Sequence, residues 1–360
     1  MRVIIITNHF QYQDGVCRAA IGMANALAKR EEFDVTLCPL FIFDRNMLSD
    51  LDERVVLKPL FKTYFRGFQR IVDLIPKIWL HKLVIGENYD IEIGYCMRMP
   101  IQLVAAAVRR KARRKDKRRY FAWMHGYDEG LSLRKEYAKI GRVICVSKQN
   151  AERLKKESNG QFSVDYAHNI VDEKAIIKLG NEAIPIARPK GVLFCSVGRF
   201  THEKGYIRLI RIVKRLNDAG YVFHLWLIGN GPEIIDVESE IVKLGIKNVK
   251  LLGEQDNPHA YTAKSDLFIC SSYSEGYSTA CTEAVMLGVP IISTEVSGAH
   301  EIIEDSNAGI VVDNNDDALY EGLRRILDDD MILSTWRKDI KREEFSASSR
   351  IQRIIDIISR

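Results

Sequence analysis

The alternation of short apolar runs with helix-forming segments is the feature that most constrains the fold of this chain. Five runs in the first half are rich in β-branched or aromatic residues: residues 2–7, 33–42, 89–96, 120–126 and 142–147. Each is followed by polar residues or by a segment with the apolar spacing of a helix. Such runs are typical of buried parallel strands, and the repeated strand–loop–helix order predicts a parallel sheet with right-handed crossovers.

The same order restarts after residues 179–191, which contain two prolines and two glycines and which we interpret as a linker. The sequence therefore predicts an α/β protein of two Rossmann-like, doubly wound domains, residues 1–180 and 181–345. A ligand is expected beyond the carboxyl ends of the strands, in a cleft between the domains. Residues 346–360 have the pattern of an amphipathic helix, which we expect to pack back on the first domain.

Composition narrows the class of protein. With 360 residues, of which 46% are hydrophobic and 28% charged, the chain suits a globular protein with two cores. No apolar run approaches the roughly 20 residues of a membrane-spanning helix, and the first one is too short for a secretory signal. The seven cysteines show no CxxC pair. We expect them to be core residues of a cytoplasmic protein.

Charge is distributed unevenly along the chain. Residues 1–180 carry 32 Lys and Arg against 21 Asp and Glu, whereas residues 181–360 carry 21 against 27. The basic run 109–119 could be a solvated helix end. Together with the aromatic and basic segment 61–83, it could instead meet an anionic membrane surface. Nucleic acid is not expected as a partner, because the aromatic residues that interleave with cations in single-strand binders are missing.

Residues 196–205 leave a predicted strand and present Arg199 and Lys204 just before a predicted helix. Two cations beside a helix N-terminus suit a phosphate group, because free backbone N–H groups and the helix dipole add to their field. The alternative is a solvated loop with surface charges. The glycine-rich turn 227–233, after the next strand, could let the backbone approach a ligand.

Two glutamates, Glu275 and Glu283, follow the apolar run 265–272. Glu275 would lie on a loop and accept hydrogen bonds from sugar hydroxyls, while Glu283, one turn into a helix, would accept two from a vicinal diol. A capping box, with a glutamate three residues after a Ser or Thr, is the alternative, but Thr282 and not a glutamate lies three residues after Thr279. Four residues of the turn have backbone N–H groups that could bind an anion. They are Gly276, Tyr277, Ser278 and Thr279.

With these residues, the chain resembles family 4 of the retaining glycosyltransferases, which have the two-domain GT-B fold. Several motif residues carry the resemblance over residues 191–310. They are Gly198, Arg199, Lys204 and Gly205, then Glu275 and Glu283, Gly288 with Pro290, and Gly298 with Glu301. In the first half, residues 124–126 resemble the segment that holds an active-site histidine, here His125, and Gly15 lies where the family has its early glycine loop.

The resemblance implies transfer of a sugar from a UDP-linked donor, with retention, to a saccharide or lipid-linked acceptor of a cell-surface polysaccharide or glycolipid. Arg199 and Lys204 would stabilise the leaving diphosphate, Glu275 would hold the donor sugar and Glu283 the ribose. His125 would lie beside the donor sugar and Gly15 would contact the donor phosphate. No metal or cofactor is expected, and we interpret Asp50 and Asp52 as a surface acidic pair. The enzyme would be peripheral on the inner face of the cell membrane.

Two further hypotheses stay open at this point. A sugar-nucleotide epimerase shares the architecture and would convert a UDP-sugar without an acceptor. A basic adaptor on anionic membranes would bind liposomes without affinity for nucleotides. The two glutamates and the two cations favour an enzyme.

Overall fold

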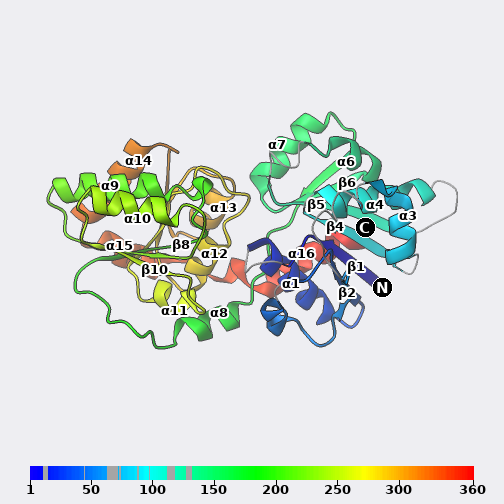
Figure 1. The fold of residues 1–360 in the computed structure, drawn as a ribbon, viewed down its shortest axis with the longest axis horizontal. Coiled ribbons are helices and arrows are strands. Elements are labelled where there is room, and N and C mark those ends of the chain that lie inside the picture. Colours follow the sequence, from blue (N-terminus) through cyan, green and yellow to red (C-terminus); the bar gives the residue numbers. More distant parts are fainter. Residues whose placement is uncertain are drawn as a thin grey trace. The chain divides into compact units, whose positions relative to one another are not determined.

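The computed structural model of the chain describes residues 1–10, 15–43, 45–62, 72, 74–86, 89–96, 98–111, 118–126 and 132–360. The chain divides into two compact units, each built on its own parallel sheet (Figure 1). Unit 1 comprises Met1–Val171 with Ala347–Arg360, and unit 2 comprises Asp172–Ser346. Most of the basic run 109–119, and residues 63–70 of the aromatic and basic segment, lie outside the described residues.

Unit 1 contains a seven-stranded sheet in which all neighbouring strands are parallel, in the order β3-β2-β1-β4-β5-β6-β7. The strands are β1 (Arg2–Thr7), β2 (Asp34–Pro39), β3 (Val56–Leu57), β4 (Ile91–Tyr95), β5 (Arg119–Met124), β6 (Arg142–Cys145) and β7 (Ser163–Tyr166). The central strand β1 pairs on both sides, so that its Ile4 lies opposite Thr36 and Glu92. The strand order reverses between β1 and β4, which makes this unit doubly wound as predicted.

Helices cover both faces of this sheet (Figure 1). The described elements are α1 (Gly15–Ala28), the 3₁₀ turn η1 (Asn46–Asp50), α3 (Lys77–Leu80), the π-helical turn η2 (His81–Ile85), α4 (Arg98–Lys111), α6 (Arg134–Ile140), α7 (Lys148–Ser158) and α16 (Ala347–Ser359). The C-terminal helix α16 contacts α1. Its Arg353 donates from Nε to the carbonyl oxygen of Tyr166 at 2.7 Å, which ties the chain's last helix to the end of β7.

Unit 2 contains a six-stranded parallel sheet in the order β10-β9-β8-β11-β12-β13. Its strands are β8 (Leu193–Val197), β9 (His224–Ile228), β10 (Val249–Gly253), β11 (Leu267–Cys270), β12 (Ile291–Thr294) and β13 (Gly309–Val312). Buried apolar side chains of β8, β9 and β11 pack in one core cluster with α9 (Tyr206–Asp218). This confirms the second doubly wound domain, whose strand order reverses between β8 and β11.

The remaining described helices of unit 2 are α8 (Glu173–Gly180), α10 (Ile234–Lys243), α11 (Pro258–Ala263), α12 (Thr279–Met286), α13 (Ala299–Ile303), α14 (Asp316–Asp328) and α15 (Ile332–Asp339), with 3₁₀ turns η3 (His202–Lys204) and η4 (Glu343–Phe345). The boundary of the units lies ahead of the predicted one at residue 180, because α8 packs on α11 and α12. A Cβ on Gly180 would lie only 2.3 Å from Leu287. This close packing assigns α8 to unit 2.

All seven cysteines lie within the described residues, are buried and form no disulfide bond, in line with their predicted place in the core. The helices among the described residues are all too short or too polar to cross a membrane.

Candidate active site

The point where the strand order of unit 2 reverses brings two predicted site residues into contact. Strands β8 and β11 are neighbours, yet the chain leaves them toward opposite neighbours in the sheet. Lys204 follows β8, and Glu275 follows β11. The carboxyl ends of the two strands meet at this place, and a ligand site is expected there in a doubly wound sheet.

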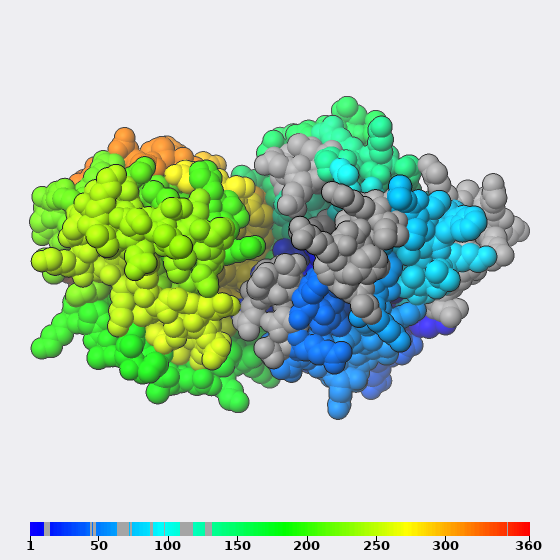
Figure 2. Space-filling model, in the orientation of Figure 1, coloured from blue at the N-terminus to red at the C-terminus, as the bar shows by residue number. Residues whose placement is uncertain are grey.

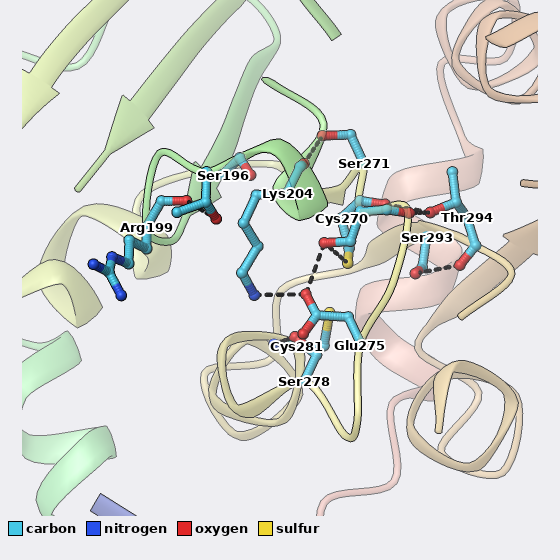
Figure 3. A network of polar contacts seen from close by, with 12 residues as sticks. Ser196, Arg199, Lys204, Cys270, Ser271, Glu275, Ser278, Cys281, Ser293 and Thr294 are labelled. Carbon is cyan, nitrogen blue, oxygen red and sulfur yellow. Dashed lines mark hydrogen bonds and ion pairs between the residues drawn. The ribbon is translucent and has the colours of Figure 1, made fainter. Parts of the chain in front are cut away.

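Lys204 and Glu275 form an ion pair, with 2.6 Å between Nζ and Oε1 (Figure 3). The hydroxyl of Ser272 donates to the same oxygen at 2.7 Å. The side chains of Lys204 and Glu275 are 26% and 11% exposed, so the pair is shielded but reachable from solvent. Burial by itself would lower the pKa of Lys204, but the Glu275 carboxylate outweighs that effect and raises the pKa. Lys204 is therefore a fixed positive charge at neutral pH.

The backbone around Lys204 explains how it reaches Glu275. Gly205 has a φ of +66° and ends the turn η3, and a Cβ on it would lie 2.2 Å from the carbonyl oxygen of Ser271. Only glycine fits this conformation and this close approach. The hydroxyl of Ser271 in turn donates to the carbonyl oxygen of Lys204 at 2.9 Å. The loop after β8 is thus held against the loop after β11.

Arg199, the second predicted cation, lies on the same loop as Lys204 but is exposed. In Figure 3 its guanidinium points away from the Lys204–Glu275 pair. Its neighbour Phe200 is fixed, because it donates from its backbone N–H to the carbonyl oxygen of Asn230 at 2.9 Å. The structure therefore presents Arg199 as an exposed arginine on an ordered loop.

The turn 276–279 leads directly into α12. Ser278 is the N-cap of that helix, and its Oγ accepts from the backbone N–H of Cys281 at 3.3 Å. The sequence analysis missed this role, because it weighed only the glutamates as possible caps. The side chain of Tyr277 is buried against Gly298, where a Cβ would lie 2.6 Å from the ring. Of the four turn residues, Gly276 and Thr279 are thus the partly exposed ones.

Glu283 lies in α12, as predicted, and its Oε2 is 3.7 Å from Nδ1 of His259 in α11. Both side chains are largely buried, at 12% and 9% exposure. His259 therefore lies beside the carboxylate, on a neighbouring helix. No local pattern predicts this contact, because the two residues are far apart in the chain.

The glycine-rich turn after β9 lies against the loop after β8. A Cβ on Gly229 would lie 2.0 Å from the carbonyl oxygen of Gly198, and one on Gly231 would lie 2.4 Å from that of Phe200. The glycines thus allow two segments of the chain's own backbone to approach closely. These glycines position the loop that carries Arg199.

The predicted residues His125 and Gly15 belong to unit 1. His125 follows β5 and lines a cavity of about 230 Å³ together with Cys96, Arg98, Trp123 and Tyr137, among others. Its ring lies 4.8 Å from that of Tyr95. Burial lowers the pKa of His125 to about 3, so the imidazole is neutral at physiological pH. Gly15 is the exposed first residue of α1, directly after residues 11–14, which lie outside the described residues.

Further polar residues hold the loop after β11 through hydrogen bonds to its backbone. Thr294, at the end of β12, donates from Oγ1 to the carbonyl oxygen of Ser272 at 2.6 Å. Asn314, after β13, donates to the carbonyl oxygen of Tyr273 at 3.0 Å, and Arg208 holds Asn314 at 2.9 Å. These residues sit at strand ends or in a helix without a recognisable motif, which is why sequence reasoning did not find them.

The acidic residues Asp50 and Asp52 were considered in connection with metal binding. Asp52 accepts two hydrogen bonds from the guanidinium of Arg54, both at 2.8 Å, while Asp50 ends the turn η1. Within the described part of the chain, no three His, Cys, Asp or Glu side chains gather closely enough to hold a metal ion.

Comparison with known proteins finds a family model that matches part of the chain. Residues 182–349 match the family model of glycosyl transferases group 1. The lipopolysaccharide core biosynthesis glycosyltransferase LpsD of Rhizobium meliloti is 25% identical over 98% of this chain and 97% of its own length. An N-acetylgalactosaminyltransferase of Campylobacter jejuni, which acts on a diphospho-undecaprenol-linked saccharide, is 28% identical over 57% of this chain and 56% of its own.

The fold comparison extends over the whole chain. The crystal structure of HepE from Anabaena in complex with UDP and glucose superposes with a TM-score of 0.72, at 15% identity, over 99% of both chains. The structural neighbours are GT-B glycosyltransferases, whose two Rossmann-like domains correspond to units 1 and 2. The chain thus carries a glycosyl transferases group 1 domain, has the GT-B fold and is a glycosyltransferase.

Proposed function

We propose that the chain is a retaining, family 4 glycosyltransferase that moves a sugar from a UDP-linked donor to a saccharide or lipid-linked saccharide during cell-surface polysaccharide or glycolipid assembly. The Lys204–Glu275 pair at the strand reversal of unit 2 carries this proposal. The name of the relative LpsD supports the pathway, and that of the Campylobacter enzyme supports a lipid-linked acceptor. The UDP in the HepE structure supports the donor nucleotide.

The donor contacts follow from charge and hydrogen-bonding capacity. Lys204 has three N–H donors, and the bond to Glu275 occupies one of them. The other two are proposed to meet the diphosphate together with Arg199 and the backbone N–H groups of the turn 276–279. Both bonds to Glu275 end on Oε1, so Oε2 is the oxygen proposed to accept from a donor-sugar hydroxyl. Glu283 would accept from the ribose diol.

In the proposed reaction a nucleoside diphosphate leaves the donor sugar. Negative charge develops on this leaving group, and the site must stabilise that charge. A cation already fixed in place stabilises that charge without reorganisation. Arg199 and Lys204 would supply this charge, so we propose that no metal ion or other cofactor is needed. In unit 1, Gly15 would contact the donor phosphate. His125, which is neutral, would serve the donor sugar as a hydrogen-bonding group.

A donor screen followed by turnover tests this function. Thermal shift with UDP-, GDP- and ADP-sugars should select UDP-sugars, and UDP release should then require a saccharide or lipid-linked acceptor. Glu275→Gln should lower turnover by about 10²-fold, as loss of a well-placed polar contact does. Glu254→Gln is the matched control, because this exposed carboxylate follows β10 at the same edge of the sheet.

Two results would contradict the proposal. One is equal loss of turnover in the Glu275 and Glu254 variants, which would remove the special role of the ion pair. The other is conversion of a UDP-sugar to its epimer without any acceptor, which would assign the site to a different reaction. The enzyme is further proposed to work in the cytoplasm, at the inner face of the cell membrane.

A further inference from the structure

The segment ahead of β4 exposes three large apolar side chains. Leu74 is 83% exposed, Trp79 is 73% and Leu83 is 85%. Trp79 and Leu83 lie four residues apart on the continuous helical stretch of α3 and η2, and therefore on one face. Figure 2 shows this part of unit 1, in light blue to cyan, at the molecular surface. We call Trp79 and Leu83 the Trp79 surface. Such clustered apolar exposure marks an interaction site.

The opposite face of the same helical stretch is anchored in the core. Leu80 and Ile85 are buried, and so is His81, whose Nε2 lies 2.7 Å from Oε2 of Glu92 on β4. Both partners of this pair are fully buried. Turning the helix to bury Trp79 would withdraw His81 and leave a buried carboxylate without this partner, at high cost in free energy. The exposure of Trp79 is therefore fixed by the packing of the helix.

The charges around the Trp79 surface select an anionic partner. Lys77 and Lys82 lie on the same helical stretch, Lys82 is exposed, and residues 74–85 contain no acidic residue. A tryptophan beside lysines is typical of a segment at a membrane interface. There the ring and aliphatic groups enter the boundary of the acyl chains, and the ammonium groups meet the headgroups.

Unit 2 offers an instructive contrast. On α10, Ile235 is 70% exposed and Val242 is 75% exposed. The same helix carries the acidic residues Asp236, Glu238 and Glu240 and has no aromatic residue. Its apolar side chains therefore lie in a field that repels an anionic surface. Only the Trp79 surface combines apolar and basic groups in this comparison.

We propose that the Trp79 surface docks on an anionic phospholipid bilayer and holds unit 1 at the membrane. The proposal builds on the proposed peripheral location of the enzyme and names the residues that produce it. Vesicle binding is measured without donor or acceptor, whereas donor binding is measured without vesicles. Failure of one proposal is thereby distinguished from failure of the other.

The fluorescence of Trp79 can report membrane binding in the intact chain. Trp123 and Trp226 are buried and Trp336 is partly buried, so Trp79 is the exposed member of the four tryptophans. We expect the chain to float with vesicles of phosphatidylcholine containing about one third phosphatidylglycerol, with a blue shift of tryptophan emission and quenching by brominated lipid. Trp79→Phe should still float and should lose the shift. Equal flotation with pure phosphatidylcholine, or none with either, would overturn the proposal.

A double variant tests the surface directly. Trp79→Ser/Leu83→Ser should lower partitioning into the anionic vesicles by at least about tenfold, because two apolar side chains no longer leave water. The matched control Ile235→Ser/Val242→Ser should partition like the wild type. Unchanged thermal unfolding and UDP binding would show that both variants fold. Wild-type partitioning of the Trp79/Leu83 variant would overturn the proposal. The proposal would also be overturned if the chain did not bind vesicles but self-associated through Trp79 and Leu83. That result would assign the surface to contact with a second copy of the chain.

Discussion

The two units share a topology but present very different chemistry at the carboxyl ends of their strands. In unit 2 the edge holds an ion pair, Lys204 with Glu275, supported by hydroxyl groups. In unit 1 the cavity after β4 and β5 is lined by aromatic groups, by Arg98 and by a histidine whose pKa is about 3. The strand reversal fixes where a site forms in each unit, and the residues just beyond the strands fix its charge.

This difference suits the two parts of the proposed nucleotide-sugar reaction. A diphosphate needs fixed positive charge, which Lys204 would supply at the edge of unit 2. A sugar or acceptor is neutral and rich in hydroxyl groups, so a neutral imidazole among aromatic rings, as at His125, would bind it without a cost for burying charge. Substitutions that change the charge at one edge test this comparison, because turnover and stability can be measured for each edge separately.

Removal of the Lys204 charge should have the largest effect. Lys204→Ala leaves the Glu275 carboxylate without its cation, and we expect turnover to fall by about 10²- to 10³-fold, which is the range for loss of a preorganised electrostatic contact. Steady-state UDP release measures this change. Lys250→Ala, at an exposed lysine of β10, is the control and should be silent. A loss of less than threefold in Lys204→Ala would show that the pair is structural only.

The second prediction concerns the neutral imidazole of His125 in unit 1 and the dependence of stability on pH. The pKa of His125 is lowered to about 3 in the folded chain, against about 6.5 when the chain is unfolded. Above pH 6.5 the residue is neutral in both states and contributes nothing. As the pH falls, only the unfolded chain takes up the proton, so stability is lost progressively between pH 6.5 and pH 3.

The free energy of unfolding of the wild type should therefore fall between pH 6.5 and pH 5. In His125→Phe this fall should be smaller by about 2 kcal/mol. Urea unfolding of both proteins at the two pH values gives the difference, and the other histidines cancel in the comparison. Parallel pH dependences of wild type and variant would mean that His125 can be protonated in the folded state. The contrast between the charged pair in unit 2 and a neutral imidazole in unit 1 would then fail.

Much of this arrangement could be read from the sequence, because it is local. Apolar runs located the strands, and the residues after them placed Lys204 and Glu275 at carboxyl ends. The contact between the two could not be derived, since it depends on β8 and β11 being neighbours in the sheet. The partnership of Glu283 with His259 escaped for the same reason.

Two local signals left part of the arrangement unpredicted. Gly229 and Gly231 were interpreted as a place where the backbone could approach a ligand, and the structure shows that they admit the chain's own loop, because glycine allows any close backbone approach and does not specify the partner. The boundary at residue 180 placed α8 in the first domain, since the proline-rich segment after it has the composition of a linker. The packing of α8 against unit 2 overrides that composition.

A smaller effect is expected from substitution of Glu283 in unit 2. This substitution tests whether the residue acts in donor binding or in the chemical step. Glu283→Gln retains the shape of the side chain but weakens its acceptance from the ribose diol, so KM for the donor should rise by about tenfold while kcat changes little. Initial rates at varied donor concentration measure both constants. Glu238→Gln, at an exposed glutamate of α10 in the same unit, is the control. An equal fall in kcat would place Glu283 in the chemical step.

The smallest effect compares the same local motif in the two units. Ser278 caps α12 in unit 2 and Ser147 caps α7 in unit 1, and each accepts a hydrogen bond from a backbone N–H three residues on. Replacement of either by Ala should cost about 1 kcal/mol of stability in urea unfolding. Only Ser278→Ala should also weaken UDP binding, by a few-fold, because its turn precedes the helix that carries Glu283. Equal UDP affinity in the two variants would show that the turn 276–279 makes no contact with the donor.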